Sequence, residues 1–315
     1  MKVAFVGKGG SGKSTLAALF IQNLRKENEK ILSIDADINQ HLAGLIGAKL
    51  DSRKAISKEK NASDIKEYLI GENNLIDSPS HMYKTTPPGK GSNLVHLAED
   101  NKIIQDYAEK LEDDTYFMHV GTYEREGIGT SCYHTDLAVF ENILSHTVLD
   151  KEWLVADMVA GTDAFSNTLH AQFDAIFFII EPTPEGIEVY NQYRELSEEA
   201  GIRENVYLIG NKVMDEEDKN YLKQSIEEDF IGFLDFKKEI KKSRQRNRTV
   251  KPELLENKLF EKIRELSEKA EMTDKERLNR LHNLHRKYVN QDYVKNAVGD
   301  ITNQIDQGFK YESDA

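Results

Sequence analysis

The chain has 315 residues, of which 31% are charged and 39% hydrophobic, and its formal net charge is −13. The length suits one large α/β domain with insertions better than two clear domains. A strongly acidic surface repels nucleic-acid phosphates and anionic lipids, so the composition argues against both as partners. The single cysteine excludes an internal disulfide and predicts a reducing compartment, the cytoplasm. No apolar run reaches the roughly 20 residues of a membrane helix, and the first strand follows a single lysine, so no signal peptide is expected.

The first motif is a glycine-rich segment between a strand and a helix. An apolar run at 3–6 predicts the strand, and the helical pattern begins at Leu16. The segment between them has the spacing GxxxxGK[ST], whose glycines let backbone N–H groups wrap around a phosphate. The lysine adds charge at the β- and γ-phosphates, and the hydroxyl after it binds Mg²⁺. A plain glycine-rich turn is the alternative. The predicted nucleotide-binding residues are Gly9, Gly10, Ser11, Gly12, Lys13, Ser14 and Thr15.

Lys8 places a second lysine near the start of this loop. The form KGGxGK[ST] resembles the deviant Walker A motif of the MinD/ParA family of ATPases, which also holds the nitrogenase iron protein and CooC-type maturation ATPases. The resemblance implies a doubly wound α/β fold with a mostly parallel sheet, and ATP and Mg²⁺ as ligands. It also implies a homodimer in which Lys8 reaches the nucleotide of the other subunit. Lys8 and Lys13 would then both act in hydrolysis.

Two aspartates follow the strand predicted at 30–34. Asp35 and Asp37 lie at its carboxyl end, where a doubly wound sheet binds its ligands. In the family that the loop resembles, the second aspartate orients or deprotonates the attacking water, and the first lies near the water shell of the metal. Asp37 is therefore the predicted catalytic carboxylate and Asp35 a residue of the Mg²⁺ shell. A helix cap and a solvated carboxylate are the alternative.

A third aspartate ends the strand predicted at 153–157. Apolar residues followed by Asp157 are typical of a Walker B strand, which presents its carboxylate to the Mg²⁺ shell. The continuation at 158–161 resembles the family's switch II, in which the amide of Gly161 senses the γ-phosphate.

Two further apolar runs, at 175–181 and 206–212, predict parallel strands that are covered on both faces. Asn211 lies at the carboxyl end of the second. The corresponding family asparagine pairs with the adenine edge, and the spacing to Asp215 does not form a guanine-reading NKxD motif, so ATP is favoured over GTP. A turn asparagine is the alternative.

Three segments outside the nucleotide site are less regular. We expect an ATPase domain at 1–270 with an irregular insertion at about 50–114, whose proline pair at 87–88 is typical of a surface loop. The insertion is interpreted as decoration or as a partner surface. The basic run at 237–251 predicts a solvated helix face, with contact to nucleic acid or a phosphorylated partner as the alternative. A last short strand is predicted at 230–235.

Residues 271–315 predict a helical C-terminal extension that packs on the domain or on the dimer mate. Its apolar residues recur at steps of three or four and would form one stripe. The stripe is thin and acids accompany its bases, which argues against a membrane-targeting helix. His282 and His285 fall on one helix turn without nearby carboxylates or cysteines, and they are predicted to be surface residues.

The single cysteine, Cys132, lies just ahead of the helix predicted at 135–149. The stretch at 155–213 resembles CooC-type nickel-insertion ATPases most, and these carry Cys-x-Cys near this place, where two subunits pool four thiolates. Here His134 replaces the second cysteine. Two chains would present two Cys and two His, a set that suits Zn²⁺ and accepts other soft divalent metals such as Ni²⁺. A buried cysteine and a helix-capping histidine are the alternative, a redox or contact role is a third, and an iron–sulfur cluster is disfavoured.

Together these features predict a cytoplasmic, homodimeric, Mg²⁺-dependent ATPase that serves metalloprotein maturation or delivers metal to a client, possible clients being metalloenzymes. The competing hypothesis is a positioning or partition ATPase of the ParA/MinD kind. A regulatory nucleotide-binding module with negligible turnover is the third.

Overall fold

An eight-stranded sheet forms the centre of the computed structural model, which describes residues 1–112, 114–122, 133–246, 248–250 and 257–311. The strand order is β3-β4-β2-β5-β1-β6-β7-β8, and every neighbouring pair is parallel except β3 with β4. The strands are β1 (Lys2–Gly7), β2 (Ile31–Asp35), β3 (Glu109–Lys110), β4 (Thr115–His119), β5 (Trp153–Asp157), β6 (Ala175–Ile180), β7 (Val206–Val213) and β8 (Phe230–Asp235). This confirms the predicted doubly wound, mostly parallel fold.

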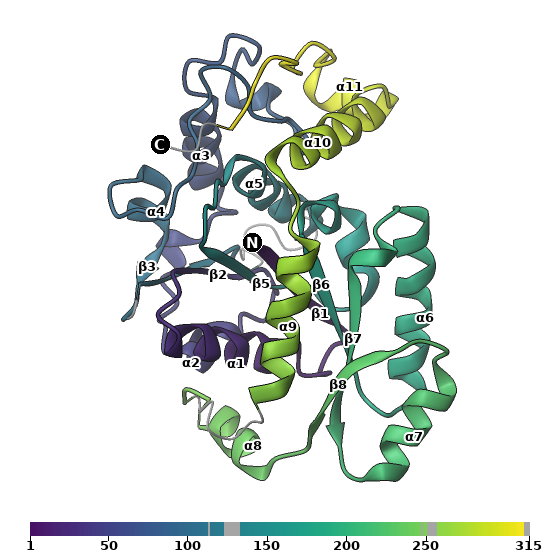
Figure 1. The fold of residues 1–315 in the computed structure, drawn as a ribbon. Coiled ribbons are helices and arrows are strands. Elements are labelled where there is room, and N and C mark those ends of the chain that lie inside the picture. The colour runs from purple at the N-terminus through teal and green to yellow at the C-terminus, as the bar shows by residue number, and fades with distance from the viewer. Residues whose placement is uncertain (113, 123–132, 247, 251–256, 312–315) are drawn as a thin grey trace.

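Helices cover both faces of the sheet (Figure 1). One apolar cluster joins the sheet to α1, α2, α8 and α9, and a second joins its other face to α3, α4, α5, α6 and α7. Because both faces are covered, β1, β2, β4, β5 and β6 are buried along their whole length. The helices are α1 (Lys13–Lys26), α2 (Leu42–Ile46), α3 (Glu59–Ile70), α4 (Lys102–Tyr107), α5 (Tyr133–His146), α6 (Pro184–Glu199), α7 (Glu216–Ser225), α8 (Lys238–Gln245), α9 (Asn257–Ala270), α10 (Asp274–Val289) and α11 (Asp292–Val298).

Helix α1 is fixed against the centre of the sheet. Its residues from Leu16 to Ile21 have no exposed surface, and the Phe20 ring meets the Trp153 ring edge-on with centroids 5.4 Å apart. Burial of this many large apolar side chains holds the first turn of α1 at the carboxyl end of β1.

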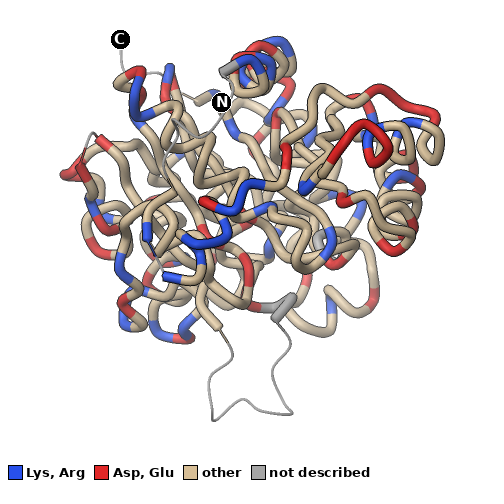
Figure 2. The backbone as a smooth tube through the Cα atoms, turned by 90° about the horizontal axis from the view of Figure 1, so that it is seen from below, with Lys and Arg blue, Asp and Glu red and all other residues tan. Residues whose placement is uncertain are grey.

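Charged residues lie around the periphery, with basic and acidic positions interspersed (Figure 2).

The proline pair predicted to lie in a surface loop is buried, so that prediction was wrong. Helices α10 and α11 lie over this segment beside α3 (Figure 1). The Thr86 hydroxyl donates to Gln304 Oε1 at 2.8 Å, and the backbone N–H of Lys90 donates to Asp306 Oδ2 at 2.9 Å. The insertion is also less irregular than expected, because it contains α3 and α4.

The two histidines of α10 are buried rather than at the surface. His282 is 6% exposed and His285 0%. The His285 ring bridges Thr85 and Ile301, with Nε2 at 3.0 Å from the Ile301 carbonyl and Nδ1 at 3.2 Å from the Thr85 hydroxyl. The prediction failed because His285 is covered by Thr85, which lies 200 positions earlier in the chain.

The expected single apolar stripe is also interrupted. Helix α10 ends at Val289 and α11 ends at Val298, and the chain continues in turns to Tyr311. Among the helices in the described part of the chain, none combines the length and apolarity needed to cross a membrane.

Candidate nucleotide-binding site

The glycine-rich loop connects β1 directly to α1. Gly10 and Gly12 have φ angles of 87° and 101°, a region that side chains rarely adopt. A Cβ atom on Gly12 would overlap the side-chain amide of Asn211. The Ser11 N–H donates to the Lys8 carbonyl at 3.0 Å, which closes the turn before α1. The loop amides are therefore gathered at the amino end of α1, where the helix dipole favours an anion.

The end of β7 holds this loop in place. Asn211 Nδ2 donates to the Ser11 carbonyl at 2.6 Å, and Lys212 Nζ donates to the Gly10 carbonyl at the same distance. Lys212 also pairs with Glu181 at 3.2 Å. Sequence reasoning missed Lys212 and Glu181, because no local pattern shows that the ends of β6 and β7 meet a loop so far away in the chain. Adenine binding by Asn211 stays a prediction.

Lys13 and Asp37 form an ion pair across the mouth of the loop. Both are almost fully buried, with exposed fractions of 5% and 2%. Asp37 Oδ1 also accepts from the backbone and side-chain amides of Asn39, both at 2.9 Å. Burial alone would raise the pKa of Asp37, but the Lys13 cation and the Asn39 donors outweigh it and hold that pKa below its usual value. A carboxylate that stays ionised is a weak base and is better suited to orienting a water molecule than to taking its proton.

Asp35 and Asp157 lie opposite each other on neighbouring strands, and neither is exposed. Asp35 accepts from the backbone N–H of Leu42 at 2.9 Å. Burial, followed by the nearby Asp157, raises the pKa of Asp35 well above its usual value. Within the described residues neither carboxylate oxygen of Asp157 has a hydrogen-bond partner. Burial raises the pKa of Asp157 to about 7, against the opposing influence of Lys13 and the Ser14 hydroxyl.

Mg²⁺ fits this arrangement as an ion that binds together with a nucleotide. No group of three or more His, Cys, Asp or Glu side chains within the described ranges forms a metal site by itself. Mg²⁺ usually takes one or two protein ligands and completes its octahedron with phosphate oxygens and water. Ser14 and the unpartnered carboxylate of Asp157 supply such a partial set.

The segment after β5 runs beside the phosphate loop. Gly161 begins a short 3₁₀ helix, Gly161–Ser166, with φ of 66°. A Cβ atom on Gly9 would lie 3.8 Å from the Ala160 Cβ atom, so the two segments are in near contact.

The Lys8 side chain is partly exposed. Cys132 lies outside the described residues, as does the side chain of His134, so the predicted transition-metal site stays a prediction.

A hollow of about 520 Å³ opens next to the loop and is the best place for the rest of a nucleotide. Gly12, Thr15 and Asn211 form its wall on the side of the loop. Apolar surface comes from Leu45, Leu234 and Ile240. The combination of a phosphate loop and an apolar wall suits a ligand with a phosphate chain and a flat base.

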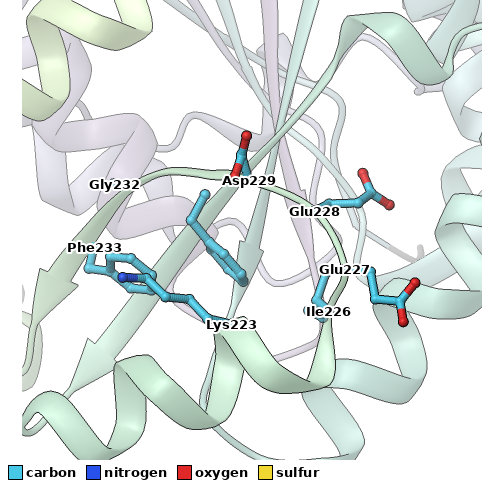
Figure 3. Close-up of a pocket in the computed structure, with 8 residues that line it drawn as sticks. Lys223, Ile226, Glu227, Glu228, Asp229, Gly232 and Phe233 are labelled. Atoms are coloured by element: carbon cyan, nitrogen blue, oxygen red, sulfur yellow. The ribbon is translucent and has the colours of Figure 1, made fainter.

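A larger hollow of about 780 Å³ lies between the end of α7 and the edge strand β8 (Figure 3). The Lys223 ammonium lies over the Phe233 ring, 5.5 Å from its centroid. Glu228 at the rim pairs with Arg203. None of the residues lining this hollow belongs to the phosphate loop, and the acidic rim repels phosphate, so it is not the nucleotide site.

Comparison with known families agrees with this geometry. The model of the CobQ/CobB/MinD/ParA nucleotide binding domain matches residues 3–250. The chain belongs to this family. Within it, the chain is 28% identical to an uncharacterized ATP-binding protein of Methanocaldococcus jannaschii over 249 residues, which are 77% of this chain and 88% of that protein.

Two further proteins extend the comparison. The carbon monoxide dehydrogenase accessory protein CooC of Rhodospirillum rubrum is 25% identical over 241 residues, 75% of this chain and 84% of CooC. The crystal structure of a ParA family ATPase from Chlorobium tepidum superposes with a TM-score of 0.58 at 14% identity, covering 84% of this chain and 98% of that one. The resemblance to this family, predicted from the loop sequence, is confirmed.

Proposed function

We propose that the chain is a Mg²⁺-dependent ATPase that hydrolyses ATP to ADP and phosphate and works as a homodimeric switch. The observation that carries this proposal is the buried Lys13–Asp37 ion pair at the mouth of the phosphate loop. It sets a cation for the phosphates beside a carboxylate for the attacking water.

Phosphoryl transfer to water depends on alignment and charge neutralisation rather than on a covalent nucleophile. The loop amides and Lys13 bind the β- and γ-phosphates, and Asp37 orients the water in line with the γ-phosphate. Ser14 and Asp157 would hold Mg²⁺, which would supply positive charge to offset that of the phosphates. Asp35 would lie near the water shell of the metal. The Gly161 amide lies on the segment that would respond to the loss of the γ-phosphate.

Substitution of Lys8 tests whether the active site is shared between two subunits. Its side chain is partly exposed at the start of the loop. A cation supplied across a subunit interface acts as arginine fingers do, which contribute on the order of 10³ to 10⁵ in rate. We expect Lys8→Ala to keep ATP affinity within about threefold but to lose ATP-driven dimerisation and most turnover.

The experiment compares Lys8→Ala with Lys60→Ala, a lysine exposed on α3. Sedimentation with and without ATP measures dimerisation, and phosphate release measures turnover. An unchanged turnover number in Lys8→Ala would refute the shared active site. Single-turnover kinetics of the wild-type protein would identify a binding module that hydrolyses too slowly to matter.

We also propose that the switch serves the maturation of a metalloprotein, and the similarity to CooC supports this role. Metal analysis of the ATP-bound dimer tests the Cys132 and His134 pair. Stoichiometric Zn²⁺ or Ni²⁺ that disappears in Cys132→Ala and His134→Ala supports metal delivery, whereas dimers that take up none refute it. Strong stimulation of turnover by nonspecific DNA or lipid vesicles would instead favour a positioning or partition ATPase.

A further inference from the structure

Helix α8 presents a basic face to the hollow beside the phosphate loop. The sequence predicts the run at 237–251 to be a solvated helix face. Ile240 is 9% exposed and joins the apolar cluster under α1, which fixes the rotation of α8. Lys241 and Arg244 lie three residues apart on the same side of the helix, and both line the hollow. The lysines and arginines of α8 are all exposed, as that prediction requires, and Lys241 and Arg244 also border the hollow.

Positive charge dominates the wall of this hollow. Lys212, Lys237, Lys241 and Arg244 line it, against the single carboxylate of Asp235. Lys212 is already bound to Glu181 and to the loop. Within the described residues the Lys241 and Arg244 side chains form no ion pair and no hydrogen bond. Two available cations beside a phosphate loop, in a chain of net charge −13, indicate an anionic ligand.

We propose that Lys241 and Arg244 bind the phosphate groups of the nucleotide held by the phosphate loop of the same chain. This inference rests on the proposed function, because it requires ATP in that loop. Helix α8 then forms the wall of the site that faces the loop, and it neutralises phosphate charge in addition to Lys13. A guanidinium is well suited to this task because its planar fork can bind two phosphate oxygens at once.

Two observations favour the phosphates over the base. The base needs apolar contact, which Leu45, Leu234 and Ile240 already provide in the same hollow. The Arg244 guanidinium also interacts electrostatically with Asp157, the proposed Mg²⁺ ligand, because it is among the groups that lower the pKa of that carboxyl.

The test compares charge removal on the two sides of α8. Lys241→Ala, Arg244→Ala and their double variant remove the cations that line the hollow. Lys242→Ala with Arg246→Ala removes the same charge from exposed positions that do not line it. Calorimetric titration with ATP, ADP and adenosine measures each dissociation constant, and phosphate release measures turnover.

We expect the double variant to weaken ATP binding about tenfold, to weaken ADP binding less and to leave adenosine binding unchanged. Arg244→Lys should retain part of the affinity. The variant Lys242→Ala with Arg246→Ala should bind all three ligands as the wild type does. The inference would be refuted if the Lys241/Arg244 double variant lost as much affinity for adenosine as for ATP. It would also be refuted if the Lys242/Arg246 variant lost the same affinity for ATP.

A double-stranded DNA oligonucleotide of mixed sequence tests the other use of these cations. If the Lys241/Arg244 double variant loses DNA binding and keeps its affinity for ATP, the inference is wrong and α8 is a nucleic-acid surface. Wild-type protein that binds ATP without hydrolysing it would refute the proposed function alone. Normal turnover with unaltered ATP affinity in the double variant would refute this inference alone, and wild-type protein that binds no ATP would refute both.

Discussion

The ammonium group of Lys13 forms an ion pair with the carboxylate of Asp37. Lys13 belongs to the phosphate loop and Asp37 to the segment after β2, so the pair joins two parts of the site. A nucleotide entering the loop must therefore compete with Asp37 for the lysine. Under the proposed function, phosphates that bind Lys13 would free the Asp37 carboxylate to orient the attacking water.

This competition predicts opposite effects of Asp37→Asn on binding and on chemistry. The substitution removes the competitor, so ATP affinity should stay the same or rise by a few fold, whereas turnover should fall by about 10² or more. Equilibrium binding and single-turnover hydrolysis separate the two effects. Asp106→Asn, at an exposed helix position, is the control. If Asp37→Asn lowers affinity and leaves the rate of the bound complex unchanged, the carboxylate acts in binding only.

Local motifs explain why the phosphate loop and its lysine were predictable from sequence. Glycine spacing, the preceding strand and the following helix all lie within about 20 residues, so no tertiary information was needed. Asp35, Asp37 and Asp157 were also predictable as a group, because Asp35 and Asp157 end apolar strands and Asp37 follows two residues after Asp35. Parallel strands present their carboxyl ends at one edge of the sheet.

Contacts between distant segments were not predictable in the same way. Lys212 looks like any residue at the end of a strand, yet it binds the Gly10 carbonyl. His285 looks like a surface residue of a polar helix, and its burial depends on Thr85 and Ile301. The basic face of α8 has the same origin, since only the fold decides which of its lysines and arginines face the loop.

Asp157 gives a prediction for stability and pH in the nucleotide-free protein. Its pKa is about 7 in the fold and 3.8 in a model peptide, so between these values the folded protein holds a proton that the unfolded chain has released. The contribution of this group to the free energy of unfolding therefore falls as pH rises. From about pH 5 to about pH 7 the wild type should lose on the order of 1–3 kcal/mol through this group.

Asp157→Asn should show a smaller loss, because the amide does not titrate and only Asp35 of the buried pair remains. Urea unfolding at the two pH values measures the difference, and Asp150→Asn, an exposed aspartate, is the control. We also expect Asp157→Asn to abolish the dependence of ATP binding on Mg²⁺. If the variant and the wild type lose equal stability over this range, Asp157 is not the titrating group.

Substitution of His285 tests whether the stability of the C-terminal helices depends on their buried contact with the segment at 85–90. Replacing the ring with a methyl group removes its bonds to Thr85 and Ile301 and leaves a cavity. We expect His285→Ala to lower the free energy of unfolding by about 2–4 kcal/mol. Lys287→Ala, exposed on the same helix, should change it by less than about 0.5 kcal/mol.

The pH dependence of this contribution has the opposite sign to that of Asp157. Burial lowers the pKa of His285 below 6.5, so the unfolded chain takes up a proton before the folded protein does. The histidine therefore stabilises the fold fully above that value, and its contribution is lost as pH falls below it. Thermal unfolding of both variants across this range should show a weaker acid dependence in His285→Ala than in Lys287→Ala. If the stability of the two variants depended equally on acid, the ring would be solvated and would not stabilise α10.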